Sequence, residues 1–257
     1  MAEVFGDRPP AVVADAFLGG RLLLCQPAEG HRCGTDAVLL AAAAPADFSG
    51  LAIDVGAGVG AAGLALAVTR PGAQIGLLEN DPFIAALARA NLLQNQLAGR
   101  GHVLEVNLMS KPSRRGAGLR DESAALVITN PPFLDPGRAR LSPDLRKRRA
   151  QAMPAEGALA AWIVASLALV APGGLFILIH RPDALPLILQ SMAGRAGAIT
   201  VLPVYPRRES KAGRVLVRGK KGARAPLEIA PPLVLHDGVG FTKAADAIHR
   251  GAAMIEW

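Results

Sequence analysis

Cysteine and aromatic residues are scarce in this sequence. Its 257 residues include 2 cysteines, and phenylalanine, tryptophan and tyrosine together make up 4% of the chain. Cys25 and Cys33 cannot build a disulfide framework, and their spacing is not that of a metal site. Because large rings are few while 51% of the residues are hydrophobic, the core has to be built from small aliphatic side chains. We therefore expect no bound metal.

Long uninterrupted apolar runs are also lacking. The longest run, residues 158–179, is divided by Pro172-Gly173-Gly174 into a segment with a helical pattern and a strand-like segment, so it does not predict a membrane span. No basic and then apolar amino-terminal segment precedes a cleavage site. Together with the low cysteine content, these absences favour a cytoplasmic protein with no membrane partner.

Strand-like and helical patterns alternate along the chain. Seven short apolar runs predict strands at residues 51–55, 74–79, 102–106, 124–129, 174–180, 198–204 and 213–219. Helical patterns at residues 61–68, 82–96, 155–170 and 184–193 separate most of them. This alternation predicts an α/β fold with a doubly wound, mostly parallel sheet. The last two strands are joined by a connection too short for a helical crossover, so the seventh strand is expected to run antiparallel.

A glycine-rich loop follows the first predicted strand. Gly56, Gly58 and Gly60 come directly after residues 51–55 and lead into a helical pattern. Glycines permit a tight turn and let a ligand approach the strand end and the start of the helix, as in nucleotide-binding α/β folds. Glu79 ends the second predicted strand, where a carboxylate can accept hydrogen bonds from both hydroxyls of a ribose. The spacing alone does not separate a dinucleotide from another adenosine-containing cofactor.

The tetrapeptide Asn130-Pro131-Pro132-Phe133 follows the fourth predicted strand. Prolines lack a backbone donor and cannot extend a buried strand, so the chain has to leave the sheet abruptly. The amide of Asn130, the carbonyl of Pro131 and the ring of Phe133 then form a rigid corner that suits a planar group with an amino nitrogen. For the tetrapeptide taken alone, an ordinary strand-ending turn is the alternative.

The glycine loop, the acidic strand end and the Asn-Pro-Pro-Phe corner, in this order, resemble the class I methyltransferases that use S-adenosylmethionine. The chain is most similar to the bacterial enzymes that methylate the exocyclic amino nitrogen of an adenine beside the anticodon of a valine tRNA. Further segments that carry the resemblance are residues 30–40, 54–60, 78–82, 171–174, 205–207 and 214–217. In that family the segment at 30–40 helps to cover the cofactor fold. The resemblance implies a seven-stranded Rossmann-like domain at residues 49–257 and an amino-terminal cap at residues 1–48.

The resemblance also implies S-adenosylmethionine as the cofactor and assigns roles to single residues. The implied cofactor-binding residues are Thr35, Asp54, Gly56, Gly58, Glu79 and Asn107. The implied catalytic residues are Asn130, Pro131 and Phe133. Asn107 departs from the family, which usually has an aspartate that accepts a hydrogen bond from the adenine amino group. An amide oxygen can still accept that bond, without the charge, so we expect a lower cofactor affinity.

Basic residues are concentrated in two segments of a chain whose net charge is +7. Residues 136–149 hold six basic residues and one acidic residue, and residues 207–224 hold eight and one. Because the first segment directly follows the Asn-Pro-Pro-Phe corner, nucleic acid is favoured over a solvated surface, and RNA, most of all tRNA, is the expected partner. The candidate phosphate-binding residues are Arg138, Arg146, Lys147, Arg148 and Arg149. A further basic segment, residues 111–120, is expected to be a loop without an assigned role.

Two other functions stay open at this point. A protein methyltransferase that acts on a glutamine amide, in a release factor or a ribosomal protein, would present the same planar nitrogen to the corner. A non-catalytic nucleic-acid-binding module is the alternative of another class. None of the candidate general bases His31, His180, His236 and His249 lies in a matching motif. The oligomeric state is left open, with a monomer favoured.

Overall fold

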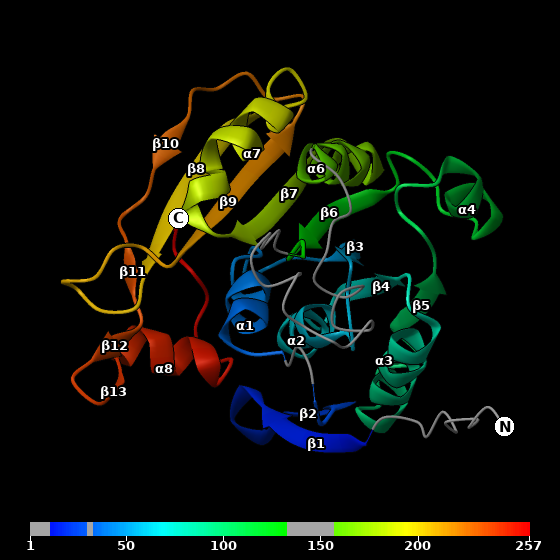
Figure 1. The fold of residues 1–257 in the computed structure, drawn as a ribbon, viewed down its shortest axis with the longest axis horizontal. Helices are drawn as coiled ribbons and strands as arrows, with labels where there is room; N and C mark the ends of the chain where they lie inside the picture. The colour runs from blue at the N-terminus through cyan, green and yellow to red at the C-terminus, as the bar shows by residue number, and fades with distance from the viewer. Residues whose placement is uncertain (1–10, 30–32, 133–156) are drawn as a thin grey trace, which may run out of the picture.

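The computed structural model describes residues 11–29, 33–132 and 157–257 (Figure 1). The strands of the central sheet are β3 Gly50–Val55, β4 Ala73–Glu79, β5 Gly101–Glu105, β6 Ala124–Thr129, β7 Val170–His180, β8 Ala196–Tyr205, β9 Arg214–Lys221, β10 Glu228–Ile229 and β11 Leu233–Val234. Their order is β10-β8-β9-β7-β6-β3-β4-β5, and β11 also pairs with β8. All seven predicted strands are present, whereas the short strands β10 and β11 were not predicted.

The strand directions confirm the predicted fold class. The pairs β3–β4, β3–β6, β4–β5 and β6–β7 are parallel. Strand β9, the seventh of the predicted strands, lies antiparallel between β7 and β8. The protein is therefore an α/β, doubly wound sheet that is mostly parallel and has an antiparallel seventh strand.

Helices cover both faces of the sheet (Figure 1). They are α1 Thr35–Ala42, α2 Ala61–Thr69, α3 Pro82–Gln94, α4 Lys111–Gly116, α6 Ala158–Leu169, α7 Leu185–Met192 and α8 Lys243–His249. Side chains alternate between the faces, as a strand requires. In β3, Ala52 packs in the apolar cluster that includes α1 and α2, whereas Ile53 and Val55 pack in the cluster that includes α6 and α7. The core is thus divided by the sheet into two layers of mainly aliphatic side chains.

The long apolar run forms a helix and a strand, as predicted, but the boundary differs. Helix α6 ends at Leu169 and β7 begins at Val170, before the Pro172-Gly173-Gly174 segment. That segment lies inside β7, where the register with β6 shifts and Gly173 has a φ of +74°. A β-bulge at this point therefore accommodates Pro172 within the strand. No helix within the described ranges is both long and apolar enough to cross a membrane.

The expectation that residues 111–120 form a loop was wrong. Helix α4 occupies the first part of this segment, and the side chain of Ser110 caps it by accepting a hydrogen bond from the Ser113 amide. Arg114 is buried, with 8% of its surface exposed, and its guanidinium donates to the Leu108 carbonyl. A serine cap followed by a proline in the first turn is a helix-start signal. The prediction missed it because it considered only the basic residues of the segment.

An amino-terminal hairpin packs against α3. It consists of β1 Val12–Phe17 and β2 Leu22–Pro27, joined by a single 3-10 turn, η1 Leu18–Gly20. The buried amide of Asn91 bonds both backbone groups of Cys25, with its oxygen accepting at 2.7 Å and its nitrogen donating at 2.9 Å. The same nitrogen donates to the Val59 carbonyl at 2.9 Å. One asparagine therefore joins the hairpin, α3 and the glycine loop.

Candidate functional site

The chemically important residues lie at one edge of the sheet. Strands β6, β3, β4 and β5 are neighbours, and their register pairs Val55 with both Thr129 and Leu78, and Glu79 with Glu105. Gly56, Asn107 and Asn130 follow the ends of three of these strands, and Glu79 ends the fourth. The structure therefore places these residues at the carboxyl edge, where doubly wound folds bind ligands.

The glycine loop needs its glycines for two reasons. Gly56, Gly58 and Gly60 have φ angles of +69°, +58° and +91°, in the region that other residues rarely adopt. In addition, a Cβ atom on Gly56 would lie 2.8 Å from Cζ2 of Trp162, a side chain of α6. The loop thus passes against an indole ring, and any side chain at position 56 would displace one of the two.

Asp54 is a buried carboxyl group directly before this loop. Only 2% of its surface is exposed, and Oδ2 accepts a 2.8 Å hydrogen bond from the Gly63 amide at the start of α2. Burial raises the pKa of Asp54 to about 7, with the bond from Gly63 acting against this shift and the charge of Glu79 adding to it. Burial, together with the nearby Asp54 carboxylate, also raises the pKa of the Cys33 thiol to about 12. Cys33, before α1, therefore belongs to the surroundings of Asp54.

Glu79 is held by three backbone amides. Its Oε2 accepts from Gly58 at 2.9 Å, and its Oε1 accepts from Asn80 and Asp81 at 2.8 Å each. A carboxylate offers about four acceptor positions, so one position on Oε2 is left for a ligand hydroxyl. The carboxylate is thus oriented before any ligand arrives, and it ties the glycine loop to the end of β4.

Asn107 is exposed and follows the end of β5. Its Oδ1 accepts a 3.0 Å hydrogen bond from the Met109 amide, and its backbone amide donates to Ser113 Oγ at 3.1 Å. An amide oxygen has two acceptor positions, so the position that is still open can take a ligand amino group.

The side chain of Asn130 has a buried oxygen atom, Oδ1, that is not satisfied by a hydrogen bond among the described residues. Buried acceptors of this kind are rare, because leaving one unsatisfied costs about 1–3 kcal/mol. The Asn130 side chain is therefore a candidate acceptor for a ligand donor.

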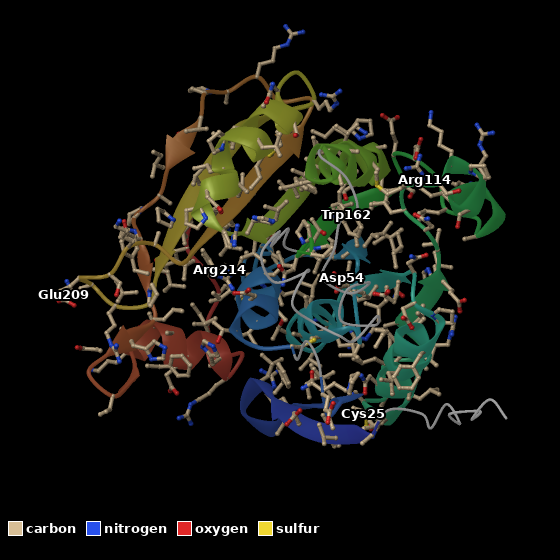
Figure 2. The ribbon with its side chains drawn as sticks, viewed as in Figure 1. Cys25, Asp54, Arg114, Trp162, Glu209 and Arg214 are labelled. Carbon is tan, nitrogen blue, oxygen red and sulfur yellow. The ribbon has the colours of Figure 1, made fainter. Side chains whose placement is uncertain are left out.

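A short relay of hydrogen bonds fixes the end of β6 next to this acceptor. The indole Nε1 of Trp162 donates to Thr129 Oγ1 at 3.0 Å, and this hydroxyl donates to the Val55 carbonyl at 2.8 Å. Trp162 and Asp54 are both labelled near the centre of Figure 2. The relay was not predicted. Thr129 borders the motif, but nothing in the sequence signals a tryptophan 33 residues further along the chain.

The remaining predicted site residues are placed differently. Thr35 begins α1, and its hydroxyl lies 3.2 Å from Nε2 of His249 in α8. Pro131 is buried directly after Asn130. The other candidates lie outside the described residues: Phe133, Arg138, Arg146, Lys147, Arg148 and Arg149.

The second basic segment, residues 207–224, does not form one surface. Its first part belongs to the loop between β8 and β9, at the carboxyl edge, and its last part lies at the opposite edge of the sheet. An eight-residue strand such as β9 separates them by roughly 26 Å. Lys221, near the far end, is engaged with Glu122 at 3.2 Å and with the Val170 carbonyl at 2.7 Å.

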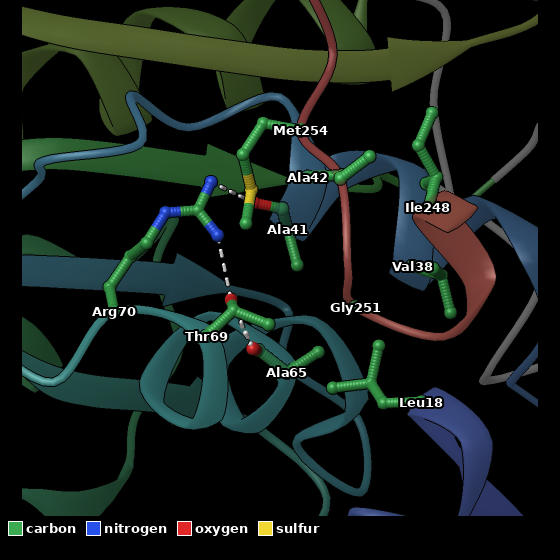
Figure 3. Close-up of a pocket in the computed structure, with 11 residues that line it drawn as sticks. Leu18, Val38, Ala41, Ala42, Ala65, Thr69, Arg70, Ile248, Gly251 and Met254 are labelled. Atoms are coloured by element: carbon green, nitrogen blue, oxygen red, sulfur yellow. Dashed lines mark hydrogen bonds between the residues drawn. The ribbon is translucent and has the colours of Figure 1, made fainter. Parts of the chain in front are cut away.

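A cavity of about 10 Å³ lies away from this edge, among η1, α1, α2 and the carboxyl-terminal segment (Figure 3). It has room for about one water molecule and none for a nucleoside. Arg70 beside it donates to the Pro45 carbonyl at 2.8 Å and to the Ala44 carbonyl at 2.6 Å, in the turn that follows α1. The described ranges contain no cluster of three or more histidine, cysteine, aspartate or glutamate side chains that could hold a metal.

The family model described as "Methyltransferase small domain" matches residues 32–179, which include every strand end of the site. The chain belongs to the methyltransferase small domain family. A solved structure of a predicted O-methyltransferase from Agrobacterium tumefaciens is 31% identical, covers 86% of this chain and 98% of its own, and superposes with a TM-score of 0.71. The Thermus thermophilus 16S rRNA N2 G1207 methyltransferase shares the fold at 20% identity and a TM-score of 0.55, covering 82% of this chain and 50% of its own.

Two curated relatives of this family member carry one and the same name, tRNA1(Val) (adenine(37)-N6)-methyltransferase. The relative from Erwinia tasmaniensis is 33% identical over 114 residues, 44% of this chain and 44% of the relative. The relative from a Flavobacteriaceae bacterium is 27% identical over 124 residues, 48% of this chain and 51% of the relative. The chain spans about half the length of the curated relatives it matches.

Proposed function

We propose that this protein is an S-adenosylmethionine-dependent methyltransferase that methylates the exocyclic amino nitrogen of an adenine in RNA, in a tRNA near the anticodon. The observation that carries the proposal is the buried Oδ1 of Asn130, which has no partner among the described residues and lies at the same edge as the glycine loop. The names of the two curated relatives support the choice of substrate. Both names specify the N6 position of an adenine, which supports transfer to nitrogen instead of oxygen.

The residues of the edge fit the cofactor. Glu79 has an acceptor position for a ribose hydroxyl, and Asn107 has one for the adenine amino group. The positive φ angles of Gly56 and Gly58 let the backbone approach a ligand closely. Asp54 supplies buried negative charge when it ionises. When bound, S-adenosylmethionine supplies an electrophilic methyl group.

The protein's task is then to position an amino nitrogen, which is a weak nucleophile because its lone pair is delocalised into the base. Asn130 Oδ1 accepts one of its hydrogens, and the Pro131 carbonyl accepts the other. These two bonds strengthen as the nitrogen becomes tetrahedral, so they stabilise the transition state more than the bound substrate. No general base is required before transfer. In this proposal Phe133 stacks on the base.

The same proposal assigns RNA phosphates to Arg138, Arg146, Lys147, Arg148 and Arg149. Residues 49–257 then form the catalytic domain, and residues 1–48 cover the cofactor. The bonds from Asn91 to Cys25 and to Val59 support this role of the amino-terminal segment, since they tie the hairpin to the glycine loop. A monomer suffices for this arrangement.

Single-turnover methylation with the Asn130→Ala variant tests the proposal. We expect the rate on a valine tRNA transcript to fall about 100-fold or more, because the lost acceptor acts mainly in the transition state. Cofactor affinity should stay unchanged. Asn95→Ala is a matched control, since this asparagine bonds the Leu23 carbonyl on the hairpin and lies away from the edge.

The product decides between the proposed reaction and its alternatives. Nucleoside analysis should find adenine methylated on the exocyclic nitrogen. A methyl group on a ribose oxygen or a ring carbon would contradict the mechanism, as would near-normal turnover by Asn130→Ala. Labelling of a release-factor glutamine in place of tRNA would make the protein an amide methyltransferase.

A further inference from the structure

Three aromatic rings form a stack at the carboxyl-terminal end of the protein. The ring of Phe241 lies 4.8 Å from that of His236 and 4.1 Å from that of His249, with interplanar angles of 18° and 22°. His236 and Phe241 belong to a hairpin, β12 His236–Asp237 and β13 Gly240–Phe241, and His249 ends α8. Phe241 is 40% exposed. Because the two imidazoles cover both faces of Phe241, its exposed part is the ring edge, and a base can stack only on the outer face of a terminal ring of the stack.

One end of the ring stack is fixed to the start of α1. Nδ1 of His249 lies 2.7 Å from the Ala245 carbonyl, and a carbonyl only accepts, so Nδ1 carries the proton. In the neutral ring, Nε2 then accepts from the hydroxyl of Thr35 at 3.2 Å. Thr35 is the first residue of α1, two positions after Cys33. The ring stack therefore begins at the amino-terminal end of α1.

The other end of the ring stack meets the loop between β8 and β9, residues 206–213. The backbone amide of His236 donates to the Pro206 carbonyl at 3.0 Å. The next residues of the loop include Arg207, Arg208 and Lys211, which are all exposed. None of these three side chains has a hydrogen bond or an ion pair within the described residues. In Figure 2 the loop reaches outward to Glu209.

The loop is anchored at its far end as well. Arg214, the first residue of β9, forms a 2.8 Å ion pair with Asp36 in the first turn of α1. The loop and the ring stack are thus both attached to the start of α1, one through Asp36 and the other through Thr35. We call the surface made by Arg207, Arg208, Lys211, His236, Phe241 and His249 the carboxyl-edge strip.

We propose that the carboxyl-edge strip binds the RNA segment that flanks the methylated nucleotide; this inference rests on the proposed function. Cations beside a ring stack suit RNA with unpaired bases, because phosphates bind the cations and a base can extend the stack at its His236 end. With Lys243, four cations on and beside the strip outnumber the carboxylates of Glu209 and Asp237. Strand β8 is three strands away from β6, roughly 14 Å across the sheet, so the strip meets neighbouring nucleotides and not the target base.

The cationic part of the strip is tested by replacing Arg207, Arg208 and Lys211 with alanine together. The matched control replaces Arg195, Lys220 and Arg224, three exposed cations at the opposite edge of the sheet. Binding is measured by fluorescence anisotropy with a valine tRNA transcript and with its anticodon stem-loop, over a range of salt concentrations. We expect the strip variant to bind at least about tenfold more weakly and to lose about 2 units of salt slope, at about 0.7 per phosphate contact. The control should change less than twofold, and cofactor affinity should be the same in both.

The ring stack is tested separately with Phe241→Leu and Phe241→Tyr. Leucine keeps the apolar volume but removes the ring that supports the His236 imidazole, so stem-loop binding should weaken about tenfold while binding to a fully paired RNA duplex stays the same. Tyrosine should restore stem-loop binding, and unchanged cofactor affinity checks that both variants are folded.

The outcomes separate this inference from the proposed function. If the wild-type protein methylates tRNA but the strip variant binds RNA no more weakly than the control, the inference is overturned and the function stands. If Phe241→Leu weakens stem-loop and duplex binding equally, the ring stack does not bind unpaired bases and is not part of the RNA-binding strip. If the wild-type protein methylates a release factor and no RNA, both the proposed function and the inference fail.

Discussion

The indole of Trp162 and the hydroxyl of Thr129 are joined by a 3.0 Å hydrogen bond between α6 and the end of β6. This side-chain bond holds the end of β6 at the point where the backbone hydrogen bonds of the sheet stop, because the two prolines after Asn130 have no amide hydrogen to donate. The same indole ring also fills the space beside Gly56. One side chain therefore holds the proposed nucleophile-binding corner and the glycine loop in a fixed relation to each other.

Trp162→Phe and Thr129→Val test this relation. The first keeps a ring near Gly56 and loses the donor, and the second keeps the shape and loses the hydroxyl. We expect either change to lower the single-turnover rate about tenfold, because a small displacement of Asn130 misaligns the nucleophile, while RNA affinity stays unchanged. The double variant should be no slower than the slower single variant, since both changes break one relay. Rate losses that multiply in the double variant would mean that the two residues act independently.

Glu79→Ala should weaken the binding of S-adenosylmethionine by about 1–3 kcal/mol. The change removes a charged acceptor for the ribose and releases the Gly58 amide from Oε2. Glu105→Ala is the matched control, because this exposed glutamate is paired with Glu79 in the register of β4 and β5 and contacts Arg89 instead, at 3.6 Å. Calorimetry with S-adenosylmethionine and with NAD measures both variants, and the wild-type protein should not bind NAD. If the two variants lose the same affinity for S-adenosylmethionine, Glu79 does not bind the ribose.

Asp54 should make the cofactor-free protein less stable as the pH rises. Its pKa is raised to about 7 in the folded protein, mainly by burial, whereas an unfolded aspartate has a pKa near 3.9. Below about pH 4 both states are protonated and the group costs nothing. Between pH 4 and 7 the unfolded state ionises first, so the free energy of unfolding falls, by on the order of 4 kcal/mol at neutral pH.

Asp54→Asn removes this ionisation and keeps an acceptor for the Gly63 amide. The variant's gain in free energy of unfolding over the wild-type protein should therefore be larger at pH 8 than at pH 5. Denaturant unfolding of the cofactor-free protein at the two pH values measures it, with the exposed Asp47→Asn as a control that should show no such trend. The same gain at both pH values would show that Asp54 does not titrate in this range.

The sequence was sufficient for the existence of the seven main strands and for the carboxyl ends of the strands that border the site. Strands β3 and β6 are short apolar runs ended by glycines or prolines, so both their existence and their carboxyl ends follow from local chemistry. This is why Gly56, Glu79 and Asn130, at the carboxyl ends of predicted parallel strands, lie at one edge, together with Asn107. The antiparallel direction of β9 followed from the length of a single connection.

The side-chain contacts that could not be predicted join segments that are far apart in the sequence. Asn91 bonds Cys25 across 66 residues, and Thr35 meets His249 across 214. No pattern along the chain encodes either pair. The division of residues 207–224 between two edges of the sheet was missed for another reason: a count of charges ignores that β9 carries the chain from one edge to the other.

Asn107→Asp should strengthen cofactor binding, because it introduces the carboxylate that the family usually has after this strand. An aspartate keeps the bond from the Met109 amide and presents a charged acceptor to the adenine amino group. Charge-assisted hydrogen bonds are about twice as strong as neutral ones, so the gain should be about 1 kcal/mol, or roughly fivefold in affinity. Glu79, at the end of the neighbouring strand β4, and Glu105, at the end of β5 itself, oppose a further negative charge and limit the gain. Calorimetry with the cofactor and with an analogue that lacks the adenine amino group separates the causes: the gain should vanish with the analogue. A gain of the same size with both ligands would place the effect of residue 107 on the loop after β5, and a weaker affinity of Asn107→Asp would show that position 107 does not face the adenine.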